Sequence, residues 1–432
     1  MIKKGLYNIP NNWCWSRLGK ITSVIGGGTP SSKISEYYDN GDIAWITPSD
    51  LSNYNNMYIS NGKKMITKLG LMKSSAKLLP KGTVCLSSRA PIGYVVIAKN
   101  ELSTNQGFKS FLPSKAFKSE YLYWYLKSIK HILEAKASGT TFLELSAKKA
   151  GEVEIPLPPI NEQQRIVNRI ESLFVKLNRA KELIENTLAQ FEQNKMAILH
   201  KAFTGELTAK WRKENNIDLS SWEKIKLGKV LLPMQTKKPT GQFFRYIDID
   251  AIDNKRQIVK APKLILTEKA PSRASRGVET GNILFSMVRP YLKNIAQIDS
   301  DLSDCIASTG FYVCRCKPEL NSRFLYYLFI FDKTIDYLMQ FMKGDNSPSI
   351  RKDDLLNMKI DLPTIEEQQE IVNILDNLLA KYNKIKNLEQ QLEKIELLKK
   401  AILAKAFRGE LGTNNPDEES AENLLKEILA EK

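Results

Sequence analysis

Two stretches of the chain carry apolar residues at alternating spacings of four and three, with polar residues between them. This pattern describes a narrow apolar seam, which is typical of helices that pair with one another. We expect long helices in the regions 157–210 and 362–412. The expected seam residues are Ile166, Ile170, Leu173, Leu177, Ile184 and Leu188 in the first region, and Ile371, Leu375, Leu378, Tyr382, Ile385 and Leu392 in the second.

Both helical regions also carry the usual signals of helix boundaries. Each begins just after a proline, with capping-box spacing that starts at Asn161 and at Thr364. Each then meets a glycine, Gly205 or Gly409, where a helix commonly ends. A long apolar seam is unstable in water alone, so we expect the two helices to pair within the chain as an antiparallel coiled coil. The alternative is that each helix packs on its own globular part.

The helical regions are copies of one another. The segment LPPINEQQRIVN at 157–168 returns as LPTIEEQQEIVN at 362–373, and KAFTGEL at 201–207 returns as KAFRGEL at 405–411. An internal repeat with so long a period indicates two similar halves rather than a solenoid. Each half is a globular part followed by a long helix.

The globular parts, residues 1–156 and 211–361, switch between two apolar periods. Short runs such as 83–87 predict strands, whereas 119–137 has helical spacing. The corresponding segments of the second part are 281–286 and 323–341. We therefore expect an α+β fold, with two globular mixed α/β domains joined by the two long helices and related by pseudo-two-fold symmetry.

A short tail, residues 413–432, follows the second helical region. It contains a run with helical amphipathic spacing after an acidic turn. The apolar members of the run are Ala421, Leu424, Leu425, Ile428 and Leu429. This helix can dock on the long helices, on a partner subunit or on its own chain, and the sequence leaves these alternatives open.

Charge points to a polyanionic partner. The chain has a formal net charge of +16. Residues 1–155 hold 21 Lys and Arg against 10 Asp and Glu, and residues 211–360 hold 25 against 17. The excess therefore lies in the globular parts, which favours nucleic acid as the partner. A basic surface that serves only solubility is the alternative.

Cysteine and histidine do not indicate a metal centre or catalysis. The five cysteines are scattered, and the alternation of Cys314 and Cys316 fits one face of a strand rather than zinc spacing. The two histidines, His131 and His200, stand alone in helical contexts. We expect structural thiols, no metal and no catalytic residue here.

Two further motifs lack the spacing that catalysis would need. The glycine-rich segment 26–33 has neither the phosphate-loop fingerprint nor the dinucleotide-binding fingerprint. We therefore interpret it as a loop that contacts the backbone of a nucleic acid. The pair Pro158-Pro159 follows Leu157 and is not the Asn/Asp-Pro-Pro-aromatic loop of an amino-methyltransferase. We expect no cofactor in this chain.

The chain has no apolar run near the roughly 18 residues that a membrane span needs. Its first five residues lack the apolar region of a secretory signal. We expect a cytoplasmic protein.

Arg89 and Arg289 are the favoured base-reading residues, because each follows a predicted strand beside a proline-containing turn and arginine can bond guanine bidentately. A structural arginine that clamps its own loop is the alternative for each. The candidate phosphate contacts are Ser31, Lys33, Lys63, Lys64, Lys237, Lys238, Arg273, Arg276 and Lys293, and weaker polar candidates are Thr47, Asn105, Gln106 and Tyr291.

Three stretches together resemble the specificity (S) subunit of type I restriction-modification systems, over essentially the whole chain. They are the segment 26–33 running on to GDIAWITPSDL at 41–51, the LPP…EQQ segment with its copy, and the FTGEL segment at 203–207 with its copy. One departure is that the second globular part lacks the Gly-Gly-Thr-Pro loop of the first.

The resemblance implies two target-recognition domains, each reading half of a split double-stranded DNA target. The chain would be non-catalytic and would hold two modification (M) subunits, which carry S-adenosylmethionine and methylate adenine. Restriction (R) subunits, which use ATP and Mg²⁺, would join that complex. The rival hypotheses are an autonomous DNA-binding regulator and a nuclease with an unrecognised site.

Overall fold

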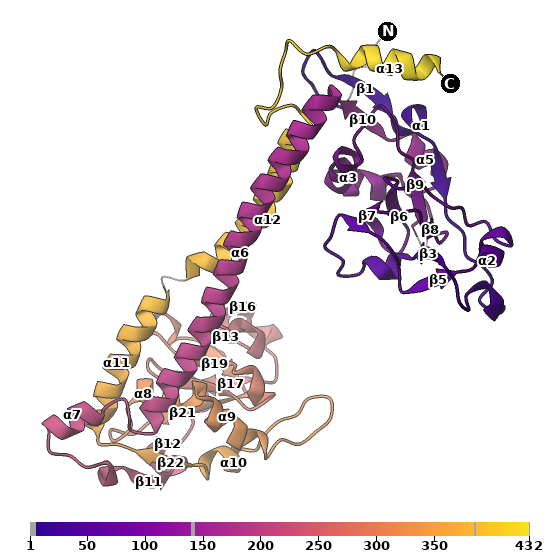
Figure 1. Ribbon diagram of the computed structural model, residues 1–432. Coiled ribbons are helices and arrows are strands. Elements are labelled where there is room, and N and C mark those ends of the chain that lie inside the picture. Colours follow the sequence, from indigo (N-terminus) through magenta and orange to yellow (C-terminus); the bar gives the residue numbers. More distant parts are fainter. Residues whose placement is uncertain (1–5, 140–142, 384–385, 432) are drawn as a thin grey trace. The chain divides into compact units, whose positions relative to one another are not determined.

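The computed structural model describes residues 6–139, 143–383 and 386–431. They form two compact units (Figure 1), one within residues 1–183 and 390–432 and the other within residues 184–389. Each unit contains one α+β domain and one part of the paired helices, as the sequence predicts. Among the described residues, no helix has the length and apolar character to cross a membrane.

The first long helix, α6, runs without a break over Ile160–Phe203. The second helical region is helical on both sides of residues 384–385, which lie outside the described residues, as α11 at Ile365–Asn383 and α12 at Lys386–Ala406. The seam residue Ile385 lies outside the described residues. Gly205 and Gly409 follow their helices with φ of +80° and +75°, a conformation that suits glycine and ends a helix.

The helices pair antiparallel in each unit. In the first unit, the Lys399 ammonium lies 5.9 Å from the ring centre of Phe174, and Lys181 bonds Glu396 at 3.3 Å. Residue numbers thus rise along α6 as they fall along α12. In the second unit, the C-terminal part of α6 lies beside α11 (Figure 1), and Leu199 shares a core with Ile371.

The seam is buried most deeply where the domains cover it. Ile166 and Ile170 join the core of the first domain, and Ile371 and Leu375 join that of the second. The rest of the seam with described side chains is half-buried, and its members are Leu173, Leu177, Ile184, Leu188, Leu378 and Leu392. Pairing and packing on the domain therefore both occur, along different parts of the same helices. The side chain of Tyr382 is outside the described residues.

The first domain, residues 14–157, is built on three sheets, with strand orders β2-β9-β6-β7-β4, β5-β3-β8 and β1-β10. The strands are β1 Cys14–Arg17, β2 Val24–Gly26, β3 Ile43–Ile46, β4 Tyr58–Ile59, β5 Lys64–Ile66, β6 Val84–Ser88, β7 Ile92–Ala98, β8 Ser103–Thr104, β9 Phe108–Phe111 and β10 Glu154–Leu157. The helices are α1 Leu18–Ile21, α2 Lys68–Met72, α3 Ser119–Ser128, α4 Lys130–Lys136 and α5 Ala147–Gly151, with 3-10 turns η1 Ser35–Tyr37 and η2 Pro48–Leu51.

The second domain repeats this plan, with strand orders β12-β21-β18-β19, β16-β13-β20-β17, β11-β22 and β14-β15. The strands are β11 Glu223–Lys226, β12 Leu231–Leu232, β13 Phe243–Ile247, β14 Ile252–Asp253, β15 Ile258–Val259, β16 Lys263–Leu266, β17 Ala274–Gly277, β18 Ile283–Ser286, β19 Ile295–Gln297, β20 Ile306–Ser308, β21 Phe311–Cys316 and β22 Lys359–Leu362. The helices are α7 Ala209–Glu214, α8 Ser322–Ile330, α9 Asp332–Met339 and α10 Lys352–Leu356, with 3-10 turns η3 Leu219–Ser221, η4 Leu227–Val230, η5 Ile249–Ala251, η6 Thr267–Lys269, η7 Pro290–Leu292 and η8 Ser300–Leu302.

The single amphipathic helix predicted in each domain is two helices. Ile129 separates α3 from α4 with φ −106° and ψ 21°, and Phe331 separates α8 from α9 in an extended conformation. The apolar pattern hides the break because buried residues line the chain on both sides of it. Leu126 and Leu133, for example, are both fully buried.

The repeated Glu-Gln-Gln motif fastens each helix to its domain. Gln163 donates to the Pro158 carbonyl and accepts from the Lys118 amide at 2.8 Å, just before α3. Gln368 makes the same bonds to Pro363 and Asn321, just before α8. These buried amides therefore fix the angle at which helix and domain meet in both halves.

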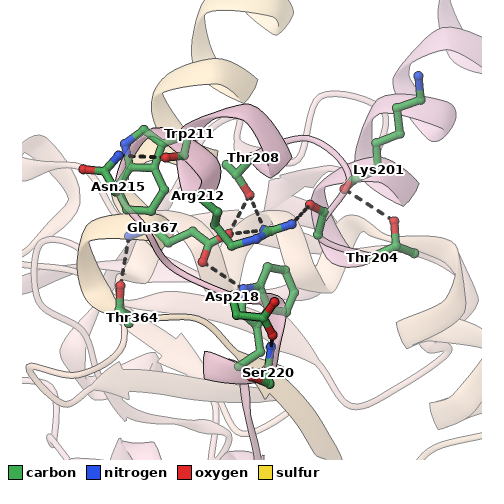
Figure 2. Close-up of polar contacts among 12 residues, drawn as sticks. Lys201, Thr204, Thr208, Trp211, Arg212, Asn215, Asp218, Ser220, Thr364 and Glu367 are labelled. Carbon is green, nitrogen blue, oxygen red and sulfur yellow. Dashed lines mark hydrogen bonds and ion pairs between the residues drawn. The ribbon is translucent and has the colours of Figure 1, made fainter.

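The glutamate of the motif is buried in both halves but has different partners. Glu367 pairs with the Arg212 guanidinium at 2.5 Å and accepts from Thr208 at 2.6 Å (Figure 2). It also accepts from the Trp222 indole at 2.9 Å. Glu162 accepts from Trp13 and Thr413, each at 3.2 Å.

No arginine pairs with Glu162 among the described residues, because Arg165 bonds Glu418 at 2.7 Å. Burial raises the pKa of the Glu162 carboxyl above its usual value. The same motif position is thus an ion pair in one half and a buried carboxyl held by neutral donors in the other.

The tail packs on its own chain, which decides between the alternatives that the sequence left open. The predicted helix is α13, Ala421–Ala430. Ala421 and Ile428 are buried in the core of the first domain, and the Ala421 amide donates to Asn12 at 3.0 Å.

We expect Ile428→Ala to lower the free energy of unfolding of the first unit by about 2 kcal/mol, because it removes buried methyl groups. Leu429→Ala is the matched control, since Leu429 is 43 % exposed. Hydrogen exchange resolved by unit measures both. Equal losses in the two variants would contradict this packing.

Candidate nucleic-acid interface

In the first domain, polar residues directly follow two strands of the small sheet β5-β3-β8, at the same end of that sheet. Strands β3 and β8 are parallel, with Ile46 opposite Thr104, so Thr47 and Asn105 follow them side by side. Thr47 starts η2, where its hydroxyl and amide both bond the Asp50 carboxylate, at 2.8 and 2.7 Å. Asn105 accepts from the Gly107 amide at 2.9 Å. The sheet therefore presents two short polar loops at one end.

The glycine-rich loop crosses this end of the sheet. The Gly28 amide donates to the Thr104 carbonyl at 2.8 Å, and the Trp45 indole donates to the Gly28 carbonyl at 3.0 Å. A Cβ on Gly28 would lie 2.1 Å from the Ala76 amide nitrogen, so only glycine fits this crossing. The Thr29 hydroxyl then bonds the Gln106 side chain.

Cations border this loop cluster. Lys63 and Lys64 are exposed, and the Lys63 amide donates to Asp50 at 3.0 Å. Ser31 and Lys33 are also exposed, on the continuation of the glycine-rich loop. The structure thus brings Thr47, Asn105, Gln106 and Lys63 into neighbouring loops, although they are far apart in the chain.

Arg89 lies beside the same cluster but has a partner inside the domain. The Ser88 amide bonds the Gly107 carbonyl at 2.7 Å, which places the end of β6 next to the loop after β8. The Arg89 guanidinium lies 3.6 Å from the Glu144 carboxylate, and Lys109 lies 3.3 Å from it. The Arg89 side chain is 35 % exposed. It is therefore accessible, although it is also held by its own loop.

The second domain places different residues at the corresponding end. Ile247 lies opposite Ala307 in the parallel pair β13–β20, so Asp248 stands where Thr47 stands in the first domain. The Lys237 amide donates to Ser275 at 3.0 Å, on the extra edge strand β17. Lys238 and Arg273 are exposed nearby in sequence, and Arg276 is half-buried on β17.

Arg289 differs from Arg89 in position and conformation. The Met287 amide bonds Gly310 at 2.9 Å, as Ser88 bonds Gly107, so the equivalent of Arg89 is Val288. Arg289 instead matches Ala90, and the two share left-handed φ values of +47° and +46°. The exposed Arg289 side chain donates to the Asn346 carbonyl at 2.9 Å.

Two neighbours of Arg289 have different surroundings. Tyr291 is 42 % exposed on η7. The Lys293 ammonium bonds the Ile330 carbonyl at 3.0 Å and pairs with Asp332, and its side chain is only 22 % exposed. Lys293 is therefore not grouped with the exposed cations, and its contact with phosphate stays a prediction.

Two basic residues of the sheet β16-β13-β20-β17 in the second domain were not predicted from the sequence. Lys263 on β16 pairs with Asp248, and Arg245 on β13 bonds Asp304 at 2.8 Å. Both lie in strands, and nothing in the sequence places those strands beside Asp248 or Asp304. A cavity of about 280 Å³ adjoins Arg245, with Lys237, Phe243, Leu264 and Asp304 among the residues that line it.

The described residues contain no group of three or more His, Cys, Asp or Glu side chains that could hold a metal ion. Cys314 is buried and Cys316 half-buried on β21, and burial raises the pKa of the Cys316 thiol to about 12. A thiol with that pKa is neutral at pH 7 and unreactive.

Comparison with known proteins identifies the family. The model of the type I restriction modification DNA specificity domain matches residues 10–190 and 222–397. The chain is 31% identical over 435 residues to the type I restriction enzyme MjaIX specificity subunit of Methanocaldococcus jannaschii, covering 93% of this chain and 94% of that relative. It is 26% identical over 458 residues to the StySPI specificity subunit of Salmonella potsdam, covering 98% and 96%.

Solved structures agree on the fold. A chain from work described as the structural basis of complex assembly and conformational transition of the type I R-M system has a TM-score of 0.70 at 21% identity, covering 94% of this chain and 100% of that chain. The HsdS subunit from Thermoanaerobacter tengcongensis has a TM-score of 0.57 at 21% identity, covering 94% and 99%.

The chain belongs to the type I restriction-modification DNA specificity family. It is a specificity subunit, which recognises DNA and is not itself the catalyst.

Proposed function

We propose that each α+β domain reads one half of a bipartite double-stranded DNA target. The repeat carries this proposal, because both domains keep the same strand register while the residues at the loop-bearing end differ. Thr47 is replaced by Asp248, and Arg89 by Val288. A shared scaffold with different polar groups at one place is what two readers of different sequences require.

The paired helices α6, α11 and α12 set the spacing between the half-sites and hold two modification (M) subunits. Those partners supply S-adenosylmethionine and methylate adenine, and restriction (R) subunits with ATP and Mg²⁺ join through them. The relatives named as specificity subunits of type I restriction enzymes support this assignment. The chain itself contributes recognition and assembly.

The direct test is to express the chain with the methyltransferase encoded beside it and map methylated adenines across a genome. A single split sequence with a fixed spacer supports the proposal. Sequence-specific binding by the chain without M subunits favours an autonomous regulator instead. Mg²⁺-dependent cleavage by the isolated chain favours a nuclease.

Arg289→Ala should relax one position in one half-site and leave the other half-site unchanged. A bidentate arginine–guanine contact contributes about 1–3 kcal/mol of discrimination, so preference at that position should fall roughly 5- to 150-fold. Arg89→Ala should do the same in the opposite half-site. Methylation mapping measures both effects.

Lys352→Ala is the matched control for lost charge, because Lys352 is exposed on α10 and outside the loop cluster. If either arginine variant altered both half-sites equally, that arginine would be a structural clamp rather than a reader.

A further inference from the structure

One lysine position is the same in both small sheets. Lys64 lies directly opposite Trp45 in the β5–β3 pair, and Lys263 lies directly opposite Tyr246 in the β16–β13 pair. Trp45 and Tyr246 are equivalent, because each stands at the same place relative to its parallel neighbour, β8 or β20. The two lysines therefore occupy one position on the outer strand of the sheet, and both are exposed.

The residues next to these cations are not the same. Lys263 pairs with Asp248, whereas the first domain has Thr47 at that place. The two halves have therefore kept a lysine at this position and changed the polar group beside it.

This combination separates two kinds of DNA contact. Phosphates are the same along every sequence, so a domain that acquires a new half-site can keep its phosphate contacts, whereas its base contacts must change. The Lys263–Asp248 pair does not prevent such a role, because an exposed ion pair contributes little and a phosphate can replace the carboxylate.

We infer that Lys64 in the first domain and Lys263 in the second bind DNA phosphates as a common docking point. This inference rests on the proposed function and adds how each domain approaches the duplex. Both domains use the same end of the small sheet, and the divergent neighbours Thr47 and Asp248 face the bases.

The test measures binding of the complex with M subunits to its own target and to an unrelated duplex, over a series of salt concentrations. Lys64→Gln and Lys263→Gln should each reduce the magnitude of the slope of log K against log salt by about 0.9, the value for one lost phosphate contact. Each should weaken binding to both duplexes by a similar factor and leave the methylated sequence unchanged. Lys64→Arg and Lys263→Arg, which keep the charge, should retain the wild-type slope.

Arg17→Gln and Lys226→Gln are matched controls. These two residues are also equivalent exposed cations, but they lie on β1 and β11, in the two-stranded sheets. Their slopes should stay at the wild-type value. Equal slope changes in controls and test variants, or a changed methylated sequence in the test variants, would overturn the inference. A wild-type complex that methylates no split sequence would instead overturn the proposed function.

Discussion

Glu367→Gln should lower the free energy of unfolding of the second unit by about 3–5 kcal/mol, the range for breaking a buried ion pair from one side. The Glu367 side chain is completely buried and that of Arg212 is 8 % exposed. Removing the carboxylate charge leaves the guanidinium buried with only neutral acceptors, which are the Gly205 carbonyl, the Thr208 hydroxyl and the new amide oxygen. Hydrogen exchange resolved by unit measures the loss.

The equivalent change in the other half should behave differently. Glu162→Gln leaves no cation unpaired, and the amide oxygen can still accept from Trp13 or Thr413. At pH 7 the first unit should change by no more than about 1 kcal/mol, the net value of one hydrogen bond. Equal losses for Glu162→Gln and Glu367→Gln would contradict the difference between the two sites.

The pH dependence of these variants separates the two sites further. Burial raises the pKa of Glu162 in the folded state, so the folded state binds the proton more tightly than the unfolded chain does. That stabilisation is complete below the unfolded pKa and is lost as the pH rises through the folded pKa. The glutamine of Glu162→Gln cannot titrate, so the variant should lack this pH-dependent loss of stability. The stability of its first unit should therefore rise relative to that of the wild type as the pH rises.

A double variant checks the origin of the Glu367 effect. Arg212→Met together with Glu367→Gln removes both charges, so most of the lost stability of the second unit should return. If the double variant were as unstable as Glu367→Gln alone, loss of the bonds to Thr208 and Trp222 would account for the effect instead.

The long helices could be predicted because their signal is local and repeated. Seam residues recur every three or four positions, and a proline and a glycine mark the ends. The depth of burial could not be predicted, because it depends on which turns the domains cover. Leu199 and Leu403, which lie outside the expected seam, are buried by their domains. The neighbouring Ile198 and Ile402 are only half-buried.

The candidate interface was predicted residue by residue but not as an arrangement. Thr47 and Asn105 meet only because the two-residue strand β8 pairs parallel with β3, and so short a strand has no readable period. Lys263 was missed because its position beside Asp248 depends on the pairing of β16 with β13, which the sequence does not show. The sequence suggests that Arg289 is the counterpart of Arg89, but the hydrogen bonds of the preceding residues show that its counterpart is Ala90. This shift of one residue cannot be seen without the structure.

Lengthening the paired helices should change the spacer of the DNA target without changing either half-site. Four residues inserted after Leu183 in α6, together with four after Glu389 in α12, preserve the antiparallel pairing within each unit. The insertion adds about 6 Å of helix. At about 3.4 Å per base pair, this corresponds to at most two additional base pairs. Methylation mapping should therefore return the same half-sites with a spacer one or two base pairs longer.

Two further variants show that the effect depends on helix length. The same four residues inserted after Pro416, an exposed position between α12 and α13, should leave the spacer unchanged. Insertion in α6 alone displaces the apolar seam of α6 relative to the seams of α11 and α12. Methylation of targets with the original spacer should then fall, whether or not targets with a longer spacer are methylated. A matched insertion in both helices that methylates the original spacer at the wild-type rate would show that the helices do not set the spacing. The loops of the two domains would then have to determine it.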